Sequence, residues 1–102
     1  MKVIKPATVR LWEHKYPTAE TSLEHWLTLM KAARFKDFAA LRQVFRSADL
    51  VRVGSDRNVV VFNISGNNYR LIAALHFNRQ CVFALRFMTH AEYNKDSWKK
   101  TL

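Results

Sequence analysis

Apolar residues in the first half of the chain recur every three or four positions, the spacing of a helix face. The first stripe follows Pro6 and predicts a short helix that ends near Pro17. A second stripe predicts a helix that continues to about Met30, and a third predicts a shorter helix after residue 37. The three stripes are Val9, Trp12 and Tyr16; Leu23, Trp26, Leu27 and Met30; and Phe38, Leu41 and Phe45.

Capping residues predict where two of these helices begin. Thr21 and Glu24 have the spacing of a capping box, in which each side chain accepts a hydrogen bond from the backbone N–H of the other residue. The second helix is therefore expected to begin at Thr21 or, alternatively, one turn earlier at Thr18. Asp37 is the expected N-cap of the third helix.

The second half of the chain is rich in β-branched and aromatic residues and has the period of strands. Turn signals at 54–57, 65–68 and 78–80 separate its strand candidates. Val3–Ile4 is a further candidate for an edge strand, and residues from Thr89 onward predict a polar turn or a short helix. The four main strand candidates are Leu50–Val53, Asn58–Ile64, Tyr69–Phe77 and Cys81–Met88.

Helices followed by a run of antiparallel strands predict an α+β fold. The N-terminal helices would pack on one face of a small antiparallel sheet, and the other face would be at least partly exposed. With 102 residues the chain is expected to form a single domain over 1–102.

The lengths of two turns predict which strand residues share a face. A two-residue turn at Gly66–Asn67 pairs Asn63 with Arg70, and a three-residue loop after Phe77 pairs Phe77 with Cys81. One face is then apolar and is the expected partner of the helices. It consists of Val60, Phe62, Ile64, Tyr69, Leu71, Ala73, Leu75, Phe77, Cys81, Phe83, Leu85 and Phe87.

The opposite face carries two arginines in the middle of the strands. The same register pairs Arg86 with Ile72, which makes Arg70 and Arg86 diagonal neighbours, and Asn63 lies beside Arg70. Guanidinium groups bind phosphate oxygens through paired hydrogen bonds. Because residues 57–91 contain no acid, anion binding is favoured over pairing with a carboxylate. The remaining residues of this face are Ala74, His76, Val82 and Ala84.

Charge supports an anionic partner. The net charge is +9, and residues 31–102 carry 13 of the 17 basic side chains against five of the eight acidic ones. Such a field attracts polyanions, so nucleic acid is the expected partner, with an acidic protein as the alternative. The single cysteine cannot form an internal disulfide, and neither a membrane span nor a signal peptide is evident, so a cytoplasmic protein is expected.

Catalytic motifs of the common kinds are missing from the sequence. It has no glycine-rich phosphate loop, no paired-cysteine motif and no metal-spaced cluster, so neither a metal nor another cofactor is expected. The local candidate for chemistry is Arg86 followed by His90 and, one helical turn later, Tyr93. Beside arginines, these groups would suit cleavage of RNA without a metal. The alternative is that they form only a capped C-terminal turn.

Three motifs resemble the HigB family of bacterial type II toxins, within the RelE/ParE superfamily. The resemblance implies an mRNA interferase that enters the ribosomal A site and cuts mRNA during translation without a metal. It also implies a cognate antitoxin, commonly a helix-turn-helix DNA-binding protein, and no membrane partner. The motifs are Gly66-Asn67-x-Tyr69-Arg70-Leu71, the turn Asn78-Arg79-Gln80, and Thr89-His90-x-Glu92-Tyr93.

The resemblance also implies roles for individual residues. Arg70 would hold the scissile phosphate, Arg86 would help to stabilise it, and His90 with Tyr93 would transfer protons or stack on a base. Two other functions stay open: a toxin of the same fold that poisons DNA gyrase, and an RNA-binding module without catalysis. Residues expected to contact RNA are Lys36, Asn63, Arg79, Lys95 and Lys99.

Overall fold

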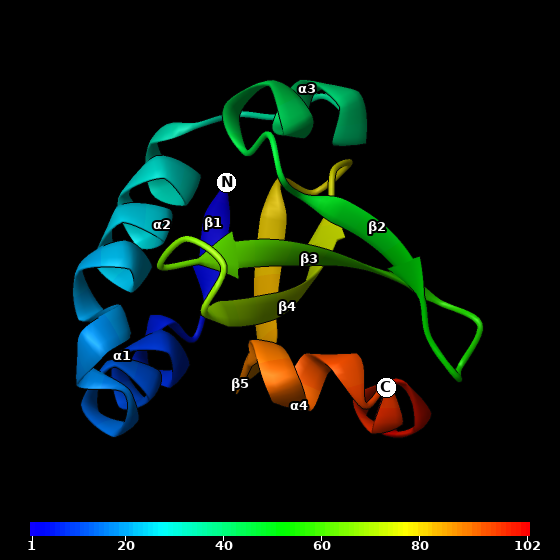
Figure 1. Cartoon of the computed structure of the whole chain (residues 1–102). Coiled ribbons are helices and arrows are strands. Elements are labelled where there is room, and N and C mark those ends of the chain that lie inside the picture. The colour runs from blue at the N-terminus through cyan, green and yellow to red at the C-terminus, as the bar shows by residue number, and fades with distance from the viewer.

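A computed structural model describes all 102 residues and contains one five-stranded sheet with the strand order β1-β5-β4-β3-β2 (Figure 1). The strands are β1 (Lys2–Ile4), β2 (Asp49–Arg52), β3 (Asn58–Ile64), β4 (Tyr69–His76) and β5 (Cys81–Thr89). The helices are α1 (Pro6–Lys15), α2 (Glu20–Ala32), α3 (Phe38–Val44) and α4 (His90–Asn94), with short 3-10 helices η1 (Pro17–Ala19) and η2 (Ser97–Thr101).

The sheet confirms the predicted α+β fold and adds one difference. Strands β2 to β5 form an antiparallel meander, as expected. The edge strand β1 pairs in parallel with β5, so the sheet is mixed rather than wholly antiparallel. The β3–β4 register agrees with the prediction, because Asn63 lies opposite Arg70.

One face of the sheet is covered by the N-terminal helices, as the apolar stripes predict. Helices α1, α2 and α3 pack over it (Figure 1). Leu23, Met30 and Leu41 are completely buried, and the Trp26 and Phe62 rings meet edge to face at 5.6 Å. This burial of apolar surface is the main force that holds the helices on the sheet.

The two predicted helix starts have different outcomes. Asp37 is the N-cap of α3, and its side chain accepts a hydrogen bond of 2.9 Å from the backbone N–H of Ala40. The capping box at Thr21 is wrong, because η1 runs directly into α2 and the helix already begins at Glu20. The alternative start at Thr18 is also wrong, and its hydroxyl instead lies 2.7 Å from that of Tyr69.

The β4–β5 hairpin contains two deviations from the prediction that cancel. Its turn is one residue longer than expected, so His76, and not Phe77, pairs with Cys81. A β-bulge at Leu85 then restores the predicted pairing of Ile72 with Arg86. Without the bulge, the period of two would turn Phe87 out of the core under the helices.

Between the β4–β5 turn and the bulge, the residues of β5 lie on the opposite face of the sheet from the one predicted. Val82 and Ala84 pack in the core under the helices, whereas Phe83 is exposed and Leu85 packs against the other face. The predicted assignment of Phe83 and Leu85 to the helix side is therefore wrong. Every residue from Cys81 to Leu85 is apolar, so the sequence pattern does not show which of them point toward the helices. The position of the bulge decides it.

The second face of the sheet is partly exposed, as expected, and partly covered. Arg86 and His76 are exposed on it. Helix α4 and η2 lie across the rest and bury a second, smaller core (Figure 1). This core consists of Val53, Val59, Val61, Ile72, Met88 and Trp98.

A partly buried carboxyl group between α1 and α2 gives a test of the helical layer. The Glu13 Oε1 atom is buried without a hydrogen-bond partner, and burial, followed by the neighbouring Glu24, raises the pKa of Glu13 above its ordinary value. Ionisation therefore costs stability as the pH rises from the ordinary pKa through the raised one. We expect Glu13→Gln to be modestly more stable than the natural protein at pH 7, with the difference vanishing in acid, as thermal unfolding at both pH values would measure. Equal stability of the two proteins at pH 7 would contradict this expectation.

Candidate active site

Arg70 is the only charged side chain that is buried, with 8% of its surface exposed. It is the second residue of β4 and points to the face that α4 covers. Its Nη1 donates to the carbonyl oxygens of Asn67 at 3.2 Å and Tyr69 at 3.0 Å. Its Nη2 donates to the side-chain oxygen of Asn67 at 2.6 Å. Neutral oxygens of the β3–β4 turn thus hold the guanidinium group in one orientation.

The positive charge of Arg70 has no acidic partner. Salt bridges form at three other places in the chain, none of them buried, and none includes Arg70. The hydrogen bonds occupy Nη1 and Nη2 and leave the Nε–H without a protein acceptor. Arginine stays ionised even when buried, so an uncompensated cation at this place attracts an anion.

His90 lies beside Arg70 because a capping box fixes the start of α4. Thr89 and Glu92 cap each other reciprocally at this helix start. The backbone N–H of His90 donates to the carbonyl oxygen of Asn68 at 2.9 Å, which ties the helix to the β3–β4 turn. His90 Nδ1 lies 3.1 Å from Arg70 Nη2 and 3.1 Å from the carbonyl oxygen of Asn67.

Tyr93 completes the group from the next turn of α4. The Arg70 guanidinium carbon lies 5.6 Å from the centre of the Tyr93 ring. Trp98 stacks on the same ring at 5.3 Å, and its indole N–H donates to the carbonyl oxygen of Tyr93 at 3.1 Å. Burial, followed by the charge of Asp49, raises the pKa of Tyr93 above 10 against the opposing effect of Lys99 and Arg70. The phenol therefore keeps its proton at neutral pH.

Arg86 stands apart from these three side chains. It is exposed on the same face, diagonal to Arg70 across the strands, and its guanidinium group donates to the carbonyl oxygen of Leu85 at 3.0 Å. The structure thus places Arg70 in contact with His90 and Tyr93 and leaves Arg86 exposed outside this group.

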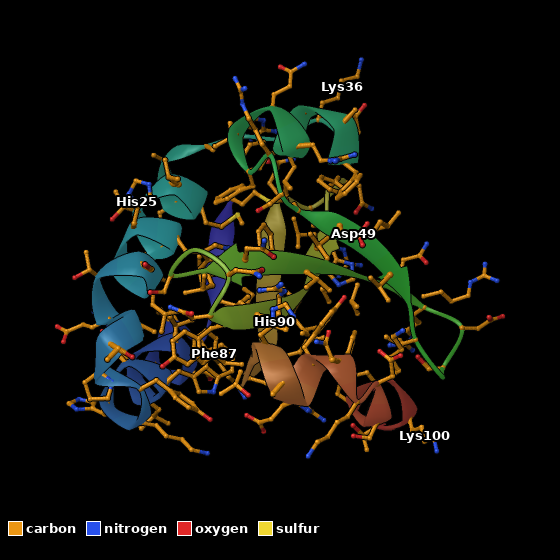
Figure 2. All side chains as sticks on the ribbon, viewed as in Figure 1. His25, Lys36, Asp49, Phe87, His90 and Lys100 are labelled. Atoms are coloured by element: carbon orange, nitrogen blue, oxygen red, sulfur yellow. The ribbon has the colours of Figure 1, made fainter.

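The residues expected to contact RNA lie in two places. Asn63 is exposed opposite Arg70, and Lys95 is exposed at the end of α4. Lys36 lies at the α3 end of the molecule, away from His90 (Figure 2), and there it lines a hollow with residues of the β4–β5 turn, in which Arg79 is exposed. Lys99 Nζ forms a salt bridge with Asp96 at 3.2 Å, so part of its charge is already compensated.

Two residues that hold the site together were not predicted from the sequence to belong to it. Asn67 is expected in a tight turn and stands in the first of the three motifs without a role of its own, yet it binds Arg70 and lies against His90. Its position three residues before a strand arginine is the only local signal. Trp98 docks the C-terminal segment against Tyr93.

The C-terminal segment that carries Trp98 depends on a glycine of the β2–β3 loop. The backbone N–H of Gly54 donates to the carbonyl oxygen of Lys99 at 2.8 Å, and a methyl group on Gly54 would lie 3.0 Å from that oxygen. We expect Gly54→Ala to lower the free energy of unfolding by about 1 kcal/mol. Chemical denaturation would measure the loss, and Ser55→Ala in the same loop is the control. A Gly54→Ala protein as stable as this control would show that the segment does not depend on the contact.

No three His, Cys, Asp or Glu side chains gather closely enough to share a metal ion. None of the helices has the length and apolar character that crossing a membrane requires.

Comparison with known proteins gives a consistent result. Residues 19–96, which include Arg70, His90 and Tyr93, match the family model for HigB toxins, described as the RelE-like toxic component of a toxin–antitoxin system. The chain is 31% identical over 94 residues to the mRNA interferase toxin HigB of Escherichia coli strain K12, and to the mRNA interferase HigB of Shigella flexneri. Each alignment covers 92% of this chain and 88% of the relative. A toxic component of such a system has an antitoxin as its partner, and this chain belongs to the HigB family of toxins.

Proposed function

We propose that this protein is the toxin of a type II toxin–antitoxin pair and an endoribonuclease that cleaves mRNA during translation. Its relatives are named mRNA interferases. The observation that carries the proposal is the uncompensated Arg70 guanidinium group, whose Nη2 lies 3.1 Å from His90 Nδ1 and whose central carbon lies 5.6 Å from the Tyr93 ring centre. A cation and a proton-transfer group are what RNA cleavage requires, and a hydroxyl can assist them.

The reaction is a transfer of the phosphodiester within the RNA chain. The ribose 2′-oxygen loses its proton to a base and forms a bond to phosphorus, while the bond from phosphorus to the 5′-oxygen of the next nucleotide breaks. An acid protonates this leaving oxygen. Negative charge builds up on the phosphoryl oxygens in the transition state, and Arg70, with Arg86 from the edge of the site, would stabilise it.

The surroundings of His90 support proton transfer in both directions. When Nδ1 carries the proton, it can donate to the carbonyl oxygen of Asn67, and Nε2 is then free to act as a base. When Nδ1 is unprotonated, it can accept from Arg70 Nη2, and Nε2–H is then an acid. Both forms have a hydrogen-bond partner 3.1 Å away, so neither leaves Nδ1 unsatisfied.

The surroundings of Tyr93 favour its hydroxyl over its ring as the functional group. Trp98 stacks on the ring and the Arg70 guanidinium lies over it, so little of the ring is left for a base. Because its pKa is raised by burial, Tyr93 is protonated at neutral pH and is a poor general base. We infer that its hydroxyl donates a hydrogen bond to the phosphate or to the leaving oxygen.

The remaining expected contacts divide between two RNA molecules. Asn63 and Lys95 lie near the site and suit the mRNA. Lys36 and Arg79, at the α3 end, suit ribosomal RNA when the protein occupies the A site. The pairing of Lys99 with Asp96 makes Lys99 the weakest contact of this group. Such contacts with phosphates are electrostatic, so binding should weaken steeply as salt is added.

The partner that restrains this toxin is, in our proposal, a helix-turn-helix DNA-binding antitoxin. The place of action is the cytoplasm, where translation occurs. The chain has 17 basic and eight acidic side chains. A partner that covers the site is therefore expected to carry negative charge there, as an acidic protein surface or RNA does. No cofactor and no membrane partner are part of the proposal.

A translation extract programmed with one mRNA tests the proposal. The purified protein should produce new mRNA 5′ ends within the translated region when ribosomes are present, and far fewer when they are left out. Intact mRNA together with inhibition of DNA supercoiling would identify a gyrase poison instead. A shift of RNA on a gel without any cut would identify a binding module.

A further inference from the structure

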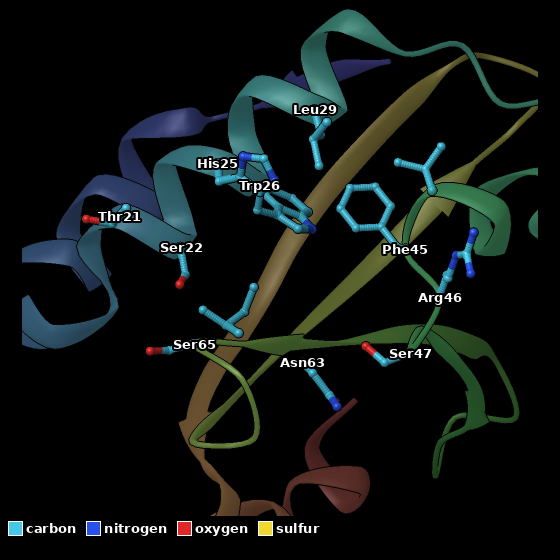
Figure 3. A pocket seen from close by; sticks show the side chains of 12 residues that line it. Thr21, Ser22, His25, Trp26, Leu29, Phe45, Arg46, Ser47, Asn63 and Ser65 are labelled. Atoms are coloured by element: carbon cyan, nitrogen blue, oxygen red, sulfur yellow. The ribbon is translucent and has the colours of Figure 1, made fainter.

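A pocket of about 500 Å³ lies on the other side of β3 from the Arg70 site. It is formed by α2, the end of α3 and the residues around the β3–β4 turn (Figure 3). Its walls include the aromatic rings of Trp26 and Phe45. The hollow is open at one side, where the Val44 side chain is 48% exposed. Nothing in the proposed cleavage chemistry uses this pocket.

Trp26 contributes an unused donor to the pocket. Only 2% of its surface is exposed, and its indole N–H has no hydrogen-bond acceptor. The nitrogen end of the indole points toward Phe45 across the pocket (Figure 3). A buried N–H without an acceptor is unfavourable, and such groups are rare in folded proteins. Because this nitrogen is covered, a ligand with an acceptor reaches the N–H only when the Phe45 ring moves aside.

The other residues that line the pocket also favour a ligand with hydrogen-bond acceptors and negative charge. Arg46, His25 and several hydroxyl groups stand around the opening, and no Asp or Glu is among the 12 lining residues. The ligand is thus expected to be flat or apolar in its body, rich in acceptors and negatively charged nearby. These are the properties of an unpaired nucleotide, whose base has ring nitrogens and carbonyls and whose phosphate is anionic.

The position of the pocket connects it with the cleavage site. Ser65 lines the pocket, and two residues later in the same turn Asn67 binds Arg70 and lies against His90. Asn63, which also lines the pocket, lies opposite Arg70 in the sheet. An RNA strand held at Arg70 therefore has the β3–β4 turn as its path to the pocket.

We propose that this pocket binds the base of an unpaired RNA nucleotide that flanks the scissile phosphate. The Trp26 indole N–H donates to an acceptor of that base, and Arg46 faces its phosphate. This inference rests on the proposed function, since it names a second contact with the same substrate. A carboxylate of a protein partner would also accept from Trp26, but the two aromatic walls and the turn shared with the cleavage site favour the nucleotide.

The test uses an RNA that the protein cannot cut. The probe is a single-stranded hexanucleotide with every ribose 2′-O-methylated, together with six versions that each lack one base. We expect the wild-type protein to lose about ten-fold in affinity when one particular base is missing, which is the scale of a single stacked base. Trp26→Phe, which keeps an aromatic ring and removes the N–H, should weaken this discrimination. The same probe should shift the Trp26 indole N–H signal in an NMR spectrum.

Arg46→Gln is the second variant, because Arg46 is exposed and its replacement leaves the core intact. It should bind the complete probe more weakly than Arg42→Gln, which removes the same charge one helical turn earlier and does not line the pocket. Thermal unfolding would establish that Trp26→Phe is folded, and Arg46→Gln carries the test if it is not.

The inference is overturned if the wild-type protein binds none of the probes, or binds all six base-deleted probes alike. It is also overturned if the pocket variants keep the discrimination and instead escape neutralisation by the antitoxin, since the pocket would then hold a protein side chain. A protein that discriminates between the probes but cuts no mRNA would support the inference about the pocket and contradict the proposed function. A protein that cuts mRNA without such discrimination would contradict only the inference about the pocket.

Discussion

Replacing Arg70 by alanine is expected to abolish mRNA cleavage and to let cells grow when the protein is produced without its antitoxin. Loss of one preorganised donor to a charged transition state costs roughly 10²–10³-fold in rate. Arg70 is also the only buried charged side chain, so no other side chain can substitute for it. Primer extension on the mRNA and growth after induction measure the two effects.

The control for Arg70 has to separate catalysis from folding. Arg70 binds two oxygens of Asn67 in the β3–β4 turn and the carbonyl oxygen of Tyr69, and its removal takes this donor away from all three. Arg70→Lys keeps a positive charge but loses the planar fork, so we expect a stable protein that remains strongly impaired. Arg52→Ala, at an exposed position of β2, should cut mRNA normally. Continued killing by a folded Arg70→Ala protein would remove Arg70 from the mechanism.

Replacing His90 by asparagine should reduce the cleavage rate by roughly 10²–10⁴-fold, the contribution of a positioned proton-transfer group. The asparagine side chain can still accept a hydrogen bond from Arg70 near the place of Nδ1, so the guanidinium group should stay in position. Binding of an uncut RNA should then change little while the rate collapses. His14→Asn, on the exposed surface of α1, is the matched control. A folded His90→Asn protein that cuts at the normal rate would exclude proton transfer by His90.

Local patterns predicted most of the fold. The bounds of β3, the N-cap at Asp37 and the pairing of Asn63 with Arg70 all agree with the sequence-based expectation. Each depends on interactions within a few residues, such as a turn or a capping side chain. The longer β4–β5 turn and the bulge at Leu85 did not follow from local patterns, because every residue from Cys81 to Leu85 is apolar. Packing of Phe87 under the helices, a long-range effect, selects that register.

The site shows the same division between local and long-range information. The sequence pattern joined His90 and Tyr93 by one helical turn after Arg86, and the family resemblance added Arg70. In the structure Arg70, rather than Arg86, contacts His90 and Tyr93. The C-terminal segment was not expected to cover part of that face. Its docking depends on Gly54 meeting Lys99 and on Trp98 filling the second core, contacts between residues far apart in the sequence. As a result, Arg70 is buried where the sequence predicts an open cationic surface.

The single-turnover rate of mRNA cleavage on programmed ribosomes tests the central claim most directly, when it is measured for Arg70→Ala, His90→Asn and the double variant. Residues that act as one unit have strongly non-additive effects. If Arg70 and His90 form one cleavage centre, the double variant should be about as slow as the slower single variant. Effects that simply multiply, or a single variant that cuts at the normal rate, would contradict the account.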